Sequence, residues 1–255
     1  MSGGRPPLAR AVVARGSAAL QPATIVGRSV TVFGRGLAPI SLLASGVTAF
    51  LWVADRAFSP MLLGGALGGP AAEAVEIALW LALILFQGAA VTAIALRTIR
   101  GERAGAVRAA AIAARRLGAV VGASLLTAAA VVPGVAAFVA PGLAALASFA
   151  VAVPVAVDER GGPVRALLRS ADLTRGRRLR VGAGLVLVAV LCSACVLLLW
   201  AGLFRIAPRT SWTGFAALLG LHALLALPAV AAAVVYEALR DAREAPEREL
   251  ERVFG

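Results

Sequence analysis

From Leu117 to Val157 the chain reads LGAVVGASLLTAAAVVPGVAAFVAPGLAALASFAVAVPVAV, a run of 41 residues without a charged side chain. A helix crosses a bilayer with about 20 mostly apolar residues, because the hydrocarbon core is about 30 Å thick. The run is therefore too long for one spanning helix and long enough for two. Because Pro-Gly pairs at 133–134 and 141–142 favour a turn, we predict a helical hairpin that turns between residues 133 and 142.

Four further apolar stretches have the length of a membrane-spanning helix: Leu37–Val53, Ile77–Leu96, Val181–Leu203 and Phe215–Tyr236. Together with the hairpin they predict an all-α polytopic membrane protein with six transmembrane helices, arranged as three helical hairpins. The predicted organisation is a basic cytoplasmic N-terminal segment over 1–36, a six-helix transmembrane domain over 37–236 and a charged cytoplasmic tail over 237–255.

The overall composition agrees with this prediction. The 255 residues are 60% hydrophobic and 15% charged, with a mean hydropathy of +0.90. A soluble domain is about 45–50% apolar and about 25% charged, so the composition excludes an ordinary soluble protein. It also excludes a disordered chain, which would be poor in apolar residues and rich in charge.

The charged residues give the expected orientation. All 25 basic residues are arginine, and 22 of them lie before the first span, between the second and third, between the fourth and fifth, or after the sixth; the other loops hold only Arg56, Arg205 and Arg209. Because basic residues accumulate on the cytoplasmic side, we expect both termini in the cytoplasm and a multi-pass protein of the bacterial cytoplasmic (inner) membrane. Four tryptophans fall near the predicted outer ends of spans, where indole rings prefer to lie: Trp52, Trp80, Trp200 and Trp212.

The two large cytoplasmic loops resemble each other, since residues 102–109 match residues 159–166 at six of eight positions. In the second loop Pro163 suits the first turn of a helix, which we predict to be amphipathic and to lie in the cytoplasmic interface. Its expected apolar face holds Val164, Leu167, Leu168 and Ala171, and its expected polar face holds Arg165, Arg169 and Asp172. If the N-terminal segment is a third copy, the chain consists of three units, each an amphipathic cytoplasmic helix followed by a helical hairpin.

Three groups of ionisable residues in or beside the spans are candidate sites. His222 lies inside the sixth span, where an ionisable residue is a functional candidate; a neutral histidine bonded to a neighbouring helix is favoured, because no acid lies centrally in a span. Cys192 and Cys195 share a helix face, but a position within the bilayer does not lower a thiol pKa, so we expect packing residues. Glu73 and Glu76 suit a solvated helix start better than a cation or general-acid site.

The small and weakly polar residues of the spans are expected to let helices pack closely in lipid: Ser41, Ser45, Thr48, Gln87, Thr92, Gly118 and Gly122. The sequence has no nucleophile–base pattern, no phosphate-binding glycine loop and no HExxH. We therefore predict no catalytic site, no cofactor, no metal site and no enzymatic activity.

Two parts of the chain resemble a known family. One runs from Val153 to Glu159 and continues through Ala166–Ser170 and Leu173–Gly176; the other is Tyr236–Arg240 with the following Arg243-Glu244, in which Ala238 replaces the family's usual Asp. These segments are similar to the membrane domain attached to some bacterial glycerophosphodiester phosphodiesterases and to its stand-alone multi-pass relatives of unknown function. The resemblance implies a six-helix membrane domain. It does not imply phosphodiesterase activity, because the catalytic barrel would add about 200 or more residues.

The most specific-looking residues lie in the cytoplasmic loops, so we expect a non-enzymatic inner-membrane protein that acts as an accessory or scaffold subunit, or as a lipid-facing membrane domain. Its basic cytoplasmic surface would bind anionic phospholipid head groups of the bilayer, with another membrane or cytoplasmic protein as a further candidate partner and no nucleic acid. The candidate surface residues are Arg108, Arg115, Arg116, Glu159, Arg165, Arg169, Ser170, Arg177 and Arg178. Two alternatives remain open: that the arginines only fix the topology, and that the protein is a permease or flippase-like transporter of unknown substrate.

Overall fold

The computed structural model describes residues 19–64, 70–206 and 211–254. About 90% of it is helical, and the described residues form no strand. The helices are α2 (Pro22–Arg35), α3 (Leu37–Gly64), α4 (Pro70–Ile99), α5 (Ala106–Ala137), α6 (Val139–Phe149), α7 (Ala152–Asp158), α8 (Pro163–Thr174), α9 (Arg178–Ile206) and α10 (Ser211–Phe254).

Five stretches within these helices are long and apolar enough to cross a membrane: Glu73–Ile99, Ala106–Ala137, Ala140–Asp158, Arg178–Gly202 and Leu219–Glu244. A sixth candidate arises if α2 and the first part of α3 are taken together, because they pass the same test as a pair bent by 75°. The helical membrane class is thus confirmed, with five to six possible spans. The candidate at the N-terminal end combines the predicted first span with the amphipathic helix before it.

The predicted turn of the central hairpin lies between the two Pro-Gly pairs. Phe138 has extended backbone angles (φ −159°, ψ 144°) and separates α5 from α6. Gly134 and Gly142 face each other across the hairpin, since a Cβ atom on Gly134 would lie only 3.0 Å from the Cα atom of Gly142. Because neither glycine has a side chain, the two helices can approach closely at this point.

The fourth predicted span is broken in the structure. Helix α6 ends at Phe149 and α7 begins at Ala152, and the two together form the candidate span that ends at Asp158. The break turns the Ser148 carbonyl toward α8, where it accepts hydrogen bonds from Ser170 Oγ (2.9 Å) and Thr174 Oγ1 (3.2 Å). These bonds fix α8 against the hairpin.

Helix α8 confirms the predicted helix after Pro163 and shows in addition which of its residues pack on the protein. The face that packs on the protein holds Ala166, Ser170, Leu173 and Thr174. Val164 and Leu168 point outward instead and are 59% and 68% exposed. An outward apolar face on a helix this polar matches a helix that lies in a membrane interface.

The structure supports the predicted repeat only in part. The second loop forms the separate helix α8, which is divided from α9 by Gly176 in a left-handed conformation (φ 79°). The matching residues of the first loop instead lead directly into α5, which runs without a break from Ala106. In the first of the three predicted units, the helix before the hairpin is α2. Residues 1–18 of the N-terminal segment lie outside the described residues.

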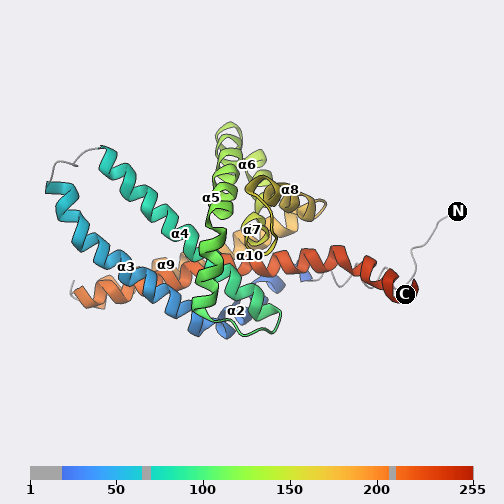
Figure 1. The fold of residues 1–255 in the computed structure, drawn as a ribbon, viewed down its shortest axis with the longest axis horizontal. Helices are drawn as coiled ribbons and strands as arrows, with labels where there is room; N and C mark the ends of the chain where they lie inside the picture. Colours follow the sequence, from blue (N-terminus) through green and yellow to red (C-terminus); the bar gives the residue numbers. More distant parts are fainter. Residues whose placement is uncertain (1–18, 65–69, 207–210, 255) are drawn as a thin grey trace.

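The three hairpins converge at one end and diverge at their tips (Figure 1). The α3–α4 tip and the α9–α10 tip extend toward one side of the view, and the α5–α6 tip projects separately. Helix α10 runs along the whole assembly and contacts α2, α3, α4, α7, α8 and α9. It also continues beyond the predicted sixth span, so the expected charged tail is helical up to Phe254. The ends of α4, α7 and α8 therefore meet the middle of α10.

Candidate functional site

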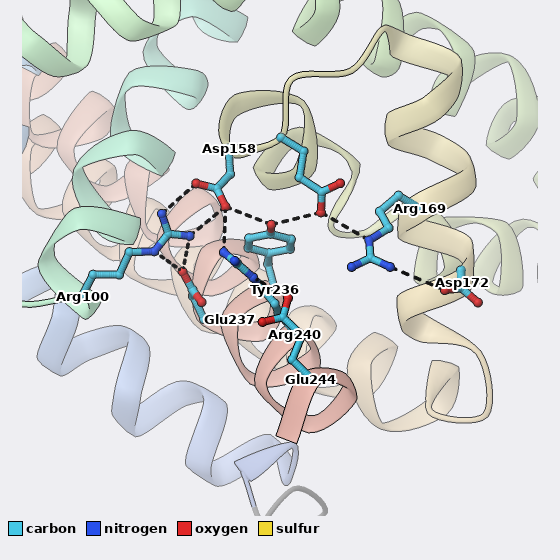
Figure 2. Close-up of polar contacts among 9 residues, drawn as sticks. Arg100, Asp158, Arg169, Asp172, Tyr236, Glu237, Arg240 and Glu244 are labelled. Atoms are coloured by element: carbon cyan, nitrogen blue, oxygen red, sulfur yellow. Dashed lines mark hydrogen bonds and ion pairs between the residues drawn. The ribbon is translucent and has the colours of Figure 1, made fainter. Parts of the chain in front are cut away.

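A network of charged side chains joins the hairpins where they converge (Figure 2). It is built from the residue after α4, the α7–α8 connection, α8 and the middle of α10. We refer to the following residues as the charged network: Arg100, Asp158, Glu159, Arg169, Asp172, Tyr236, Glu237, Arg240, Arg243 and Glu244.

Arg100 joins two carboxylates of the network, Asp158 and Glu237. Its Nη1 and Nη2 atoms donate to the two carboxylate oxygens of Asp158, both at 2.7 Å, and its Nε atom donates to Glu237 Oε1 at 2.6 Å. The side chains of Asp158 and Glu237 are only 17% and 10% exposed. The hydrogen bonds to Asp158 raise the pKa of the Arg100 guanidinium above its ordinary value, so this arginine is a permanent cation. Bidentate pairing with a partly buried carboxylate is among the stronger polar contacts in proteins.

Arg100 is held in place by the turn that ends α4. Gly101 adopts a left-handed conformation (φ 73°), which glycine reaches without steric cost. The backbone N–H of Glu102 then donates to the Arg97 carbonyl at 2.8 Å, closing the helix end. The arginine therefore projects from a fixed helix terminus.

Tyr236, the only tyrosine of the chain, links the network to the hydrophobic core. Its ring is fully buried, and its hydroxyl donates to Asp158 Oδ2 at 3.0 Å, with Glu159 Oε1 at 3.3 Å as a second acceptor. One turn further along α10, Arg240 Nη1 donates to Asp158 Oδ2 at 3.2 Å. Asp158 thus receives hydrogen bonds from two helices that are distant in sequence.

The outer half of the network is more exposed. Arg169 Nε lies 3.3 Å from Glu159 Oε1, and Arg243 Nη2 donates to Asp172 Oδ1 at 2.6 Å and to the Asp172 carbonyl at 2.9 Å. The Arg243 and Asp172 side chains are each 48% exposed. Such pairs contribute little free energy individually, but they orient α8 against α10.

The arrangement suits a structural joint better than a reaction centre. Asp158, Glu237, Glu159 and Asp172 are each ion-paired with an arginine. A general acid or base needs a carboxyl that can reach the reacting group, whereas the oxygens of these four carboxylates already contact guanidinium groups. Among the described residues, no group of three or more His, Cys, Asp or Glu side chains could hold a metal ion.

The arginines around the network differ from those within it. No described carboxylate lies within ion-pair distance of six of the candidate surface residues, Arg108, Arg115, Arg116, Arg165, Arg177 and Arg178. Two other candidates, Glu159 and Arg169, belong to the network itself. The remaining candidate, Ser170, is fully buried and bonds to Ser148, so it does not lie on the surface.

Arginines of α8 and of the α8–α9 turn that have no carboxylate partner among the described residues line shallow hollows. A hollow of about 420 Å³ is bordered by Arg165 together with network residues. Two others, of about 550 Å³ and 320 Å³, share Arg175, with Arg178 lining the first and Arg177 and Arg243 the second. The structure therefore gathers Arg175, Arg177 and Arg178 at the left-handed Gly176, whereas Arg108, Arg115 and Arg116 lie separately on the first turns of α5.

Large apolar side chains point outward beside these arginines. Leu179, between Arg178 and Arg180, is 89% exposed, and Val107, next to Arg108, is 82% exposed. On α8 the outward Val164 and Leu168 precede Arg165 and Arg169. We refer to Val164, Arg165, Leu168, Arg175, Arg177, Arg178 and Leu179 as the basic face.

The histidine of the sixth span bonds to neighbouring helices, as favoured from the sequence. His222 is 6% exposed; its Nδ1 atom lies 3.2 Å from Thr48 Oγ1, and its backbone carbonyl accepts a hydrogen bond from Gln87 Nε2 at 3.1 Å. Residues of α3, α4 and α10 therefore meet in one polar cluster. Thr92 instead donates to the Gly88 carbonyl of its own helix, as Ser45 does to Ser41.

The two cysteines have different surroundings. Both are free thiols, Cys192 buried and Cys195 exposed. Pro228 has no backbone N–H, so the Leu224 carbonyl one turn earlier lacks its helical partner, and Cys192 Sγ donates to it at 3.2 Å. Cys192 therefore joins α9 to α10 at the proline of α10.

The remaining candidates are packing or surface positions. Gly122 lies against α8, because a Cβ atom there would be 2.8 Å from Pro163 Cβ, whereas Gly118 faces open space. Glu73 is exposed, and Trp80 and Trp200 are partly exposed. The side chains of Glu76, Trp52 and Trp212 lie outside the described part of the structure.

Sequence reasoning missed the centre of the network, since Arg100, Asp158, Tyr236, Glu237 and Arg240 were not candidate residues. A signal was present, because the two segments that carry the family resemblance contain Asp158-Glu159 and Tyr236–Arg240. The structure shows that these two segments contact each other. Arg100 belongs to no such segment and lies only within the broad cytoplasmic surface expected over Arg97–Arg116.

No protein-family model, no curated protein and no solved structure matches this chain. The resemblance to the membrane domain of glycerophosphodiester phosphodiesterases therefore stays a prediction.

Proposed function

We propose that this chain is a non-enzymatic, multi-pass protein of a bacterial inner membrane that uses its basic face to bind anionic phospholipid head groups on the cytoplasmic side. In this role it serves as a scaffold or lipid-facing membrane domain. The cytoplasmic placement of both termini is supported by the 22 arginines that fall on one side of the predicted spans.

The observation that carries the proposal is the division of the arginines into two groups. Carboxylates of the charged network pair with Arg100, Arg169, Arg240 and Arg243. The arginines of the basic face have no carboxylate partner among the described residues. They lie beside apolar side chains that point outward. A helix in the membrane interface needs apolar side chains that enter the acyl region. It also needs cationic side chains that contact the lipid phosphates.

A transporter ranks second, because a permease needs a polar path between its helices. Where the structure has a cavity among the spans, most of its lining residues are apolar.

The expected contribution of the basic face can be bounded. An arginine near an anionic surface contributes about 1 kcal/mol, and four lie on this face: Arg165, Arg175, Arg177 and Arg178. If they act at only half that strength, together they account for about a thirtyfold change in affinity.

The test is thermal unfolding of the purified protein in mild detergent, with added dioleoyl phosphatidylglycerol or phosphatidylcholine. A ligand that binds only the folded state raises the midpoint of unfolding, so phosphatidylglycerol should stabilise the protein and phosphatidylcholine should not. A variant with Arg165, Arg175, Arg177 and Arg178 changed to Gln should lose this response. The matched variant with the same four changed to Lys should keep most of it. Equal responses of the Gln variant and the unmodified protein would contradict the proposal.

A further inference from the structure

A cavity of about 300 Å³ lies between the spanning helices, away from the basic face. Its walls come from α4, α5, α7 and α10, and most of its lining is apolar. Ile84 and Leu225 belong to the lining and are each 50% exposed, whereas Val91 and Val120 are fully buried. The cavity therefore has a closed inner end and a mouth on the lipid-facing surface of the helices.

The helix around Pro228 explains why space remains here. Pro228 breaks the regular hydrogen bonding of α10, and the freed Leu224 carbonyl turns to Cys192 of α9. Besides Pro228, α10 lines the cavity with three alanines, Ala226, Ala229 and Ala232, and with the larger His222 and Leu225. Small side chains beside a proline leave a gap that neighbouring helices do not fill.

The side-chain oxygen of Gln87, in the wall, has no hydrogen-bond partner among the described residues. Gln87 is 6% exposed, and its Nε2 atom donates to the His222 carbonyl, which fixes the orientation of the amide because only the NH₂ group can donate. Its Oε1 atom accepts no hydrogen bond from any described residue, and Gln87 lines the cavity. The Thr92 hydroxyl, also in the wall, already donates to Gly88. A ligand in the cavity could therefore donate a hydrogen bond to Gln87 Oε1.

The depth of Gln87 limits what the ligand can be. It lies thirteen residues before Arg100, which at about 1.5 Å per residue places it about 20 Å from the charged network. With a hydrocarbon core about 30 Å thick, this level is near the middle of the bilayer. A charged group is costly there, and the head group of a phospholipid stays at the interface. The ligand is therefore an uncharged lipid whose polar end can enter the core.

We propose that this cavity binds the hydroxyl end of a long-chain alcohol, whose O–H donates to Gln87 Oε1. The hydroxyl is the smallest uncharged lipid group that donates a hydrogen bond, and about 300 Å³ accommodates about ten water-sized groups. The cavity thus holds the hydroxyl and the first part of the chain. The rest of the chain leaves between Ile84 and Leu225 into the surrounding lipid.

The test is photolabelling of the purified full chain in detergent with a 16-carbon alcohol that carries a diazirine and an alkyne. Labelling should saturate, should map to peptides of α4 and α10 beside the cavity, and should be competed by unlabelled hexadecanol. The methyl ether of hexadecanol, which cannot donate, should compete about tenfold more weakly. Diffuse labelling that does not saturate, or equal competition by the ether, would overturn the proposal, since a bound water or lipid tails would then account for the cavity.

Two variants separate binding from folding. Gln87→Met removes the acceptor at similar volume and should weaken labelling about fivefold to tenfold. Ala229→Phe fills the cavity from the α10 wall without touching Gln87 and should abolish saturable labelling. The same change on the exposed face of α9, Ala194→Phe, is the control and should label like the unmodified protein. Unchanged labelling of Ala229→Phe, with a thermal unfolding profile like that of the unmodified protein, would refute the site.

Discussion

Replacing Asp158 by Asn tests whether the charged network holds the hairpins together. The substitution keeps the shape of the side chain and one oxygen, but it removes the negative charge. In the structure Asp158 Oδ1 accepts from Arg100 Nη1, and Oδ2 accepts from Arg100 Nη2, Tyr236 and Arg240. The new side-chain amide would place an NH₂ group against one or more of these donors, because its single oxygen can serve only one side.

The size of the effect follows from these contacts. A hydrogen bond to a charged group contributes about 1.5–3 kcal/mol, and breaking one partner of a buried pair costs about 3–5 kcal/mol. The contacts share one carboxylate and are not additive, and Arg100 keeps its bond to Glu237. We therefore expect Asp158→Asn to lower the free energy of unfolding by about 3 kcal/mol.

Reversible unfolding in mixed detergent micelles measures this change. Glu102→Gln is the control, since Glu102 pairs with Arg97 but its side chain is 50% exposed; exposed pairs contribute about 0–1 kcal/mol. A double-mutant cycle of Asp158→Asn with Arg100→Gln should give a coupling energy of about 2 kcal/mol. If Asp158→Asn differs from the unmodified protein by no more than Glu102→Gln does, the network does not stabilise the fold and the reasoning fails.

Three further predictions use the same unfolding assay. Tyr236→Phe should cost about 1 kcal/mol, because it removes one hydroxyl from the network and leaves the buried ring in place; no measurable change would show that the hydroxyl bonds are weak. Gly122→Ala should destabilise by about 1–2 kcal/mol, since the new Cβ atom would clash with Pro163, while Gly118→Ala, which meets open space, should be neutral or slightly stabilising; equal effects would contradict the packing of α8 on α5. Cys192→Ala should cost about 1–2 kcal/mol by leaving the Leu224 carbonyl unpaired, whereas Cys195→Ala should change little, and the reverse order would be inconsistent with the described thiol bond.

The helical membrane class could be predicted because it depends on properties that act along the chain. Apolar run length, Pro-Gly pairs and the position of arginines are local, and they indicated the central hairpin and the helix after Pro163. The break at residues 150–151 was not predicted, because the apolar run is uniform there and the break is stabilised by Ser170 and Thr174, which are 22 and 26 residues from Ser148. The face of α8 that packs on the protein was not predicted for the same reason, since Ser170 and Thr174 are buried through their bonds to Ser148.

The centre of the charged network was harder to predict because its members are distant in sequence. Arg100 and Asp158 are 58 residues apart, and Arg100 and Glu237 are 137 apart. Nothing in their local sequence distinguishes Arg100, which pairs with Asp158, from Arg177, which has no carboxylate partner among the described residues. The positions of the arginines indicated the orientation of the spans, whereas the pairing of each one depends on how the hairpins meet.

The most direct test of lipid binding by the basic face is native mass spectrometry of the protein purified from its own membranes in mild detergent. We expect anionic phospholipid to be retained at about one molecule or more per chain, and to be lost from the variant with Arg165, Arg175, Arg177 and Arg178 changed to Gln. Retention of the same lipids by both proteins, or of no anionic lipid by either, would contradict the proposed role of the basic face.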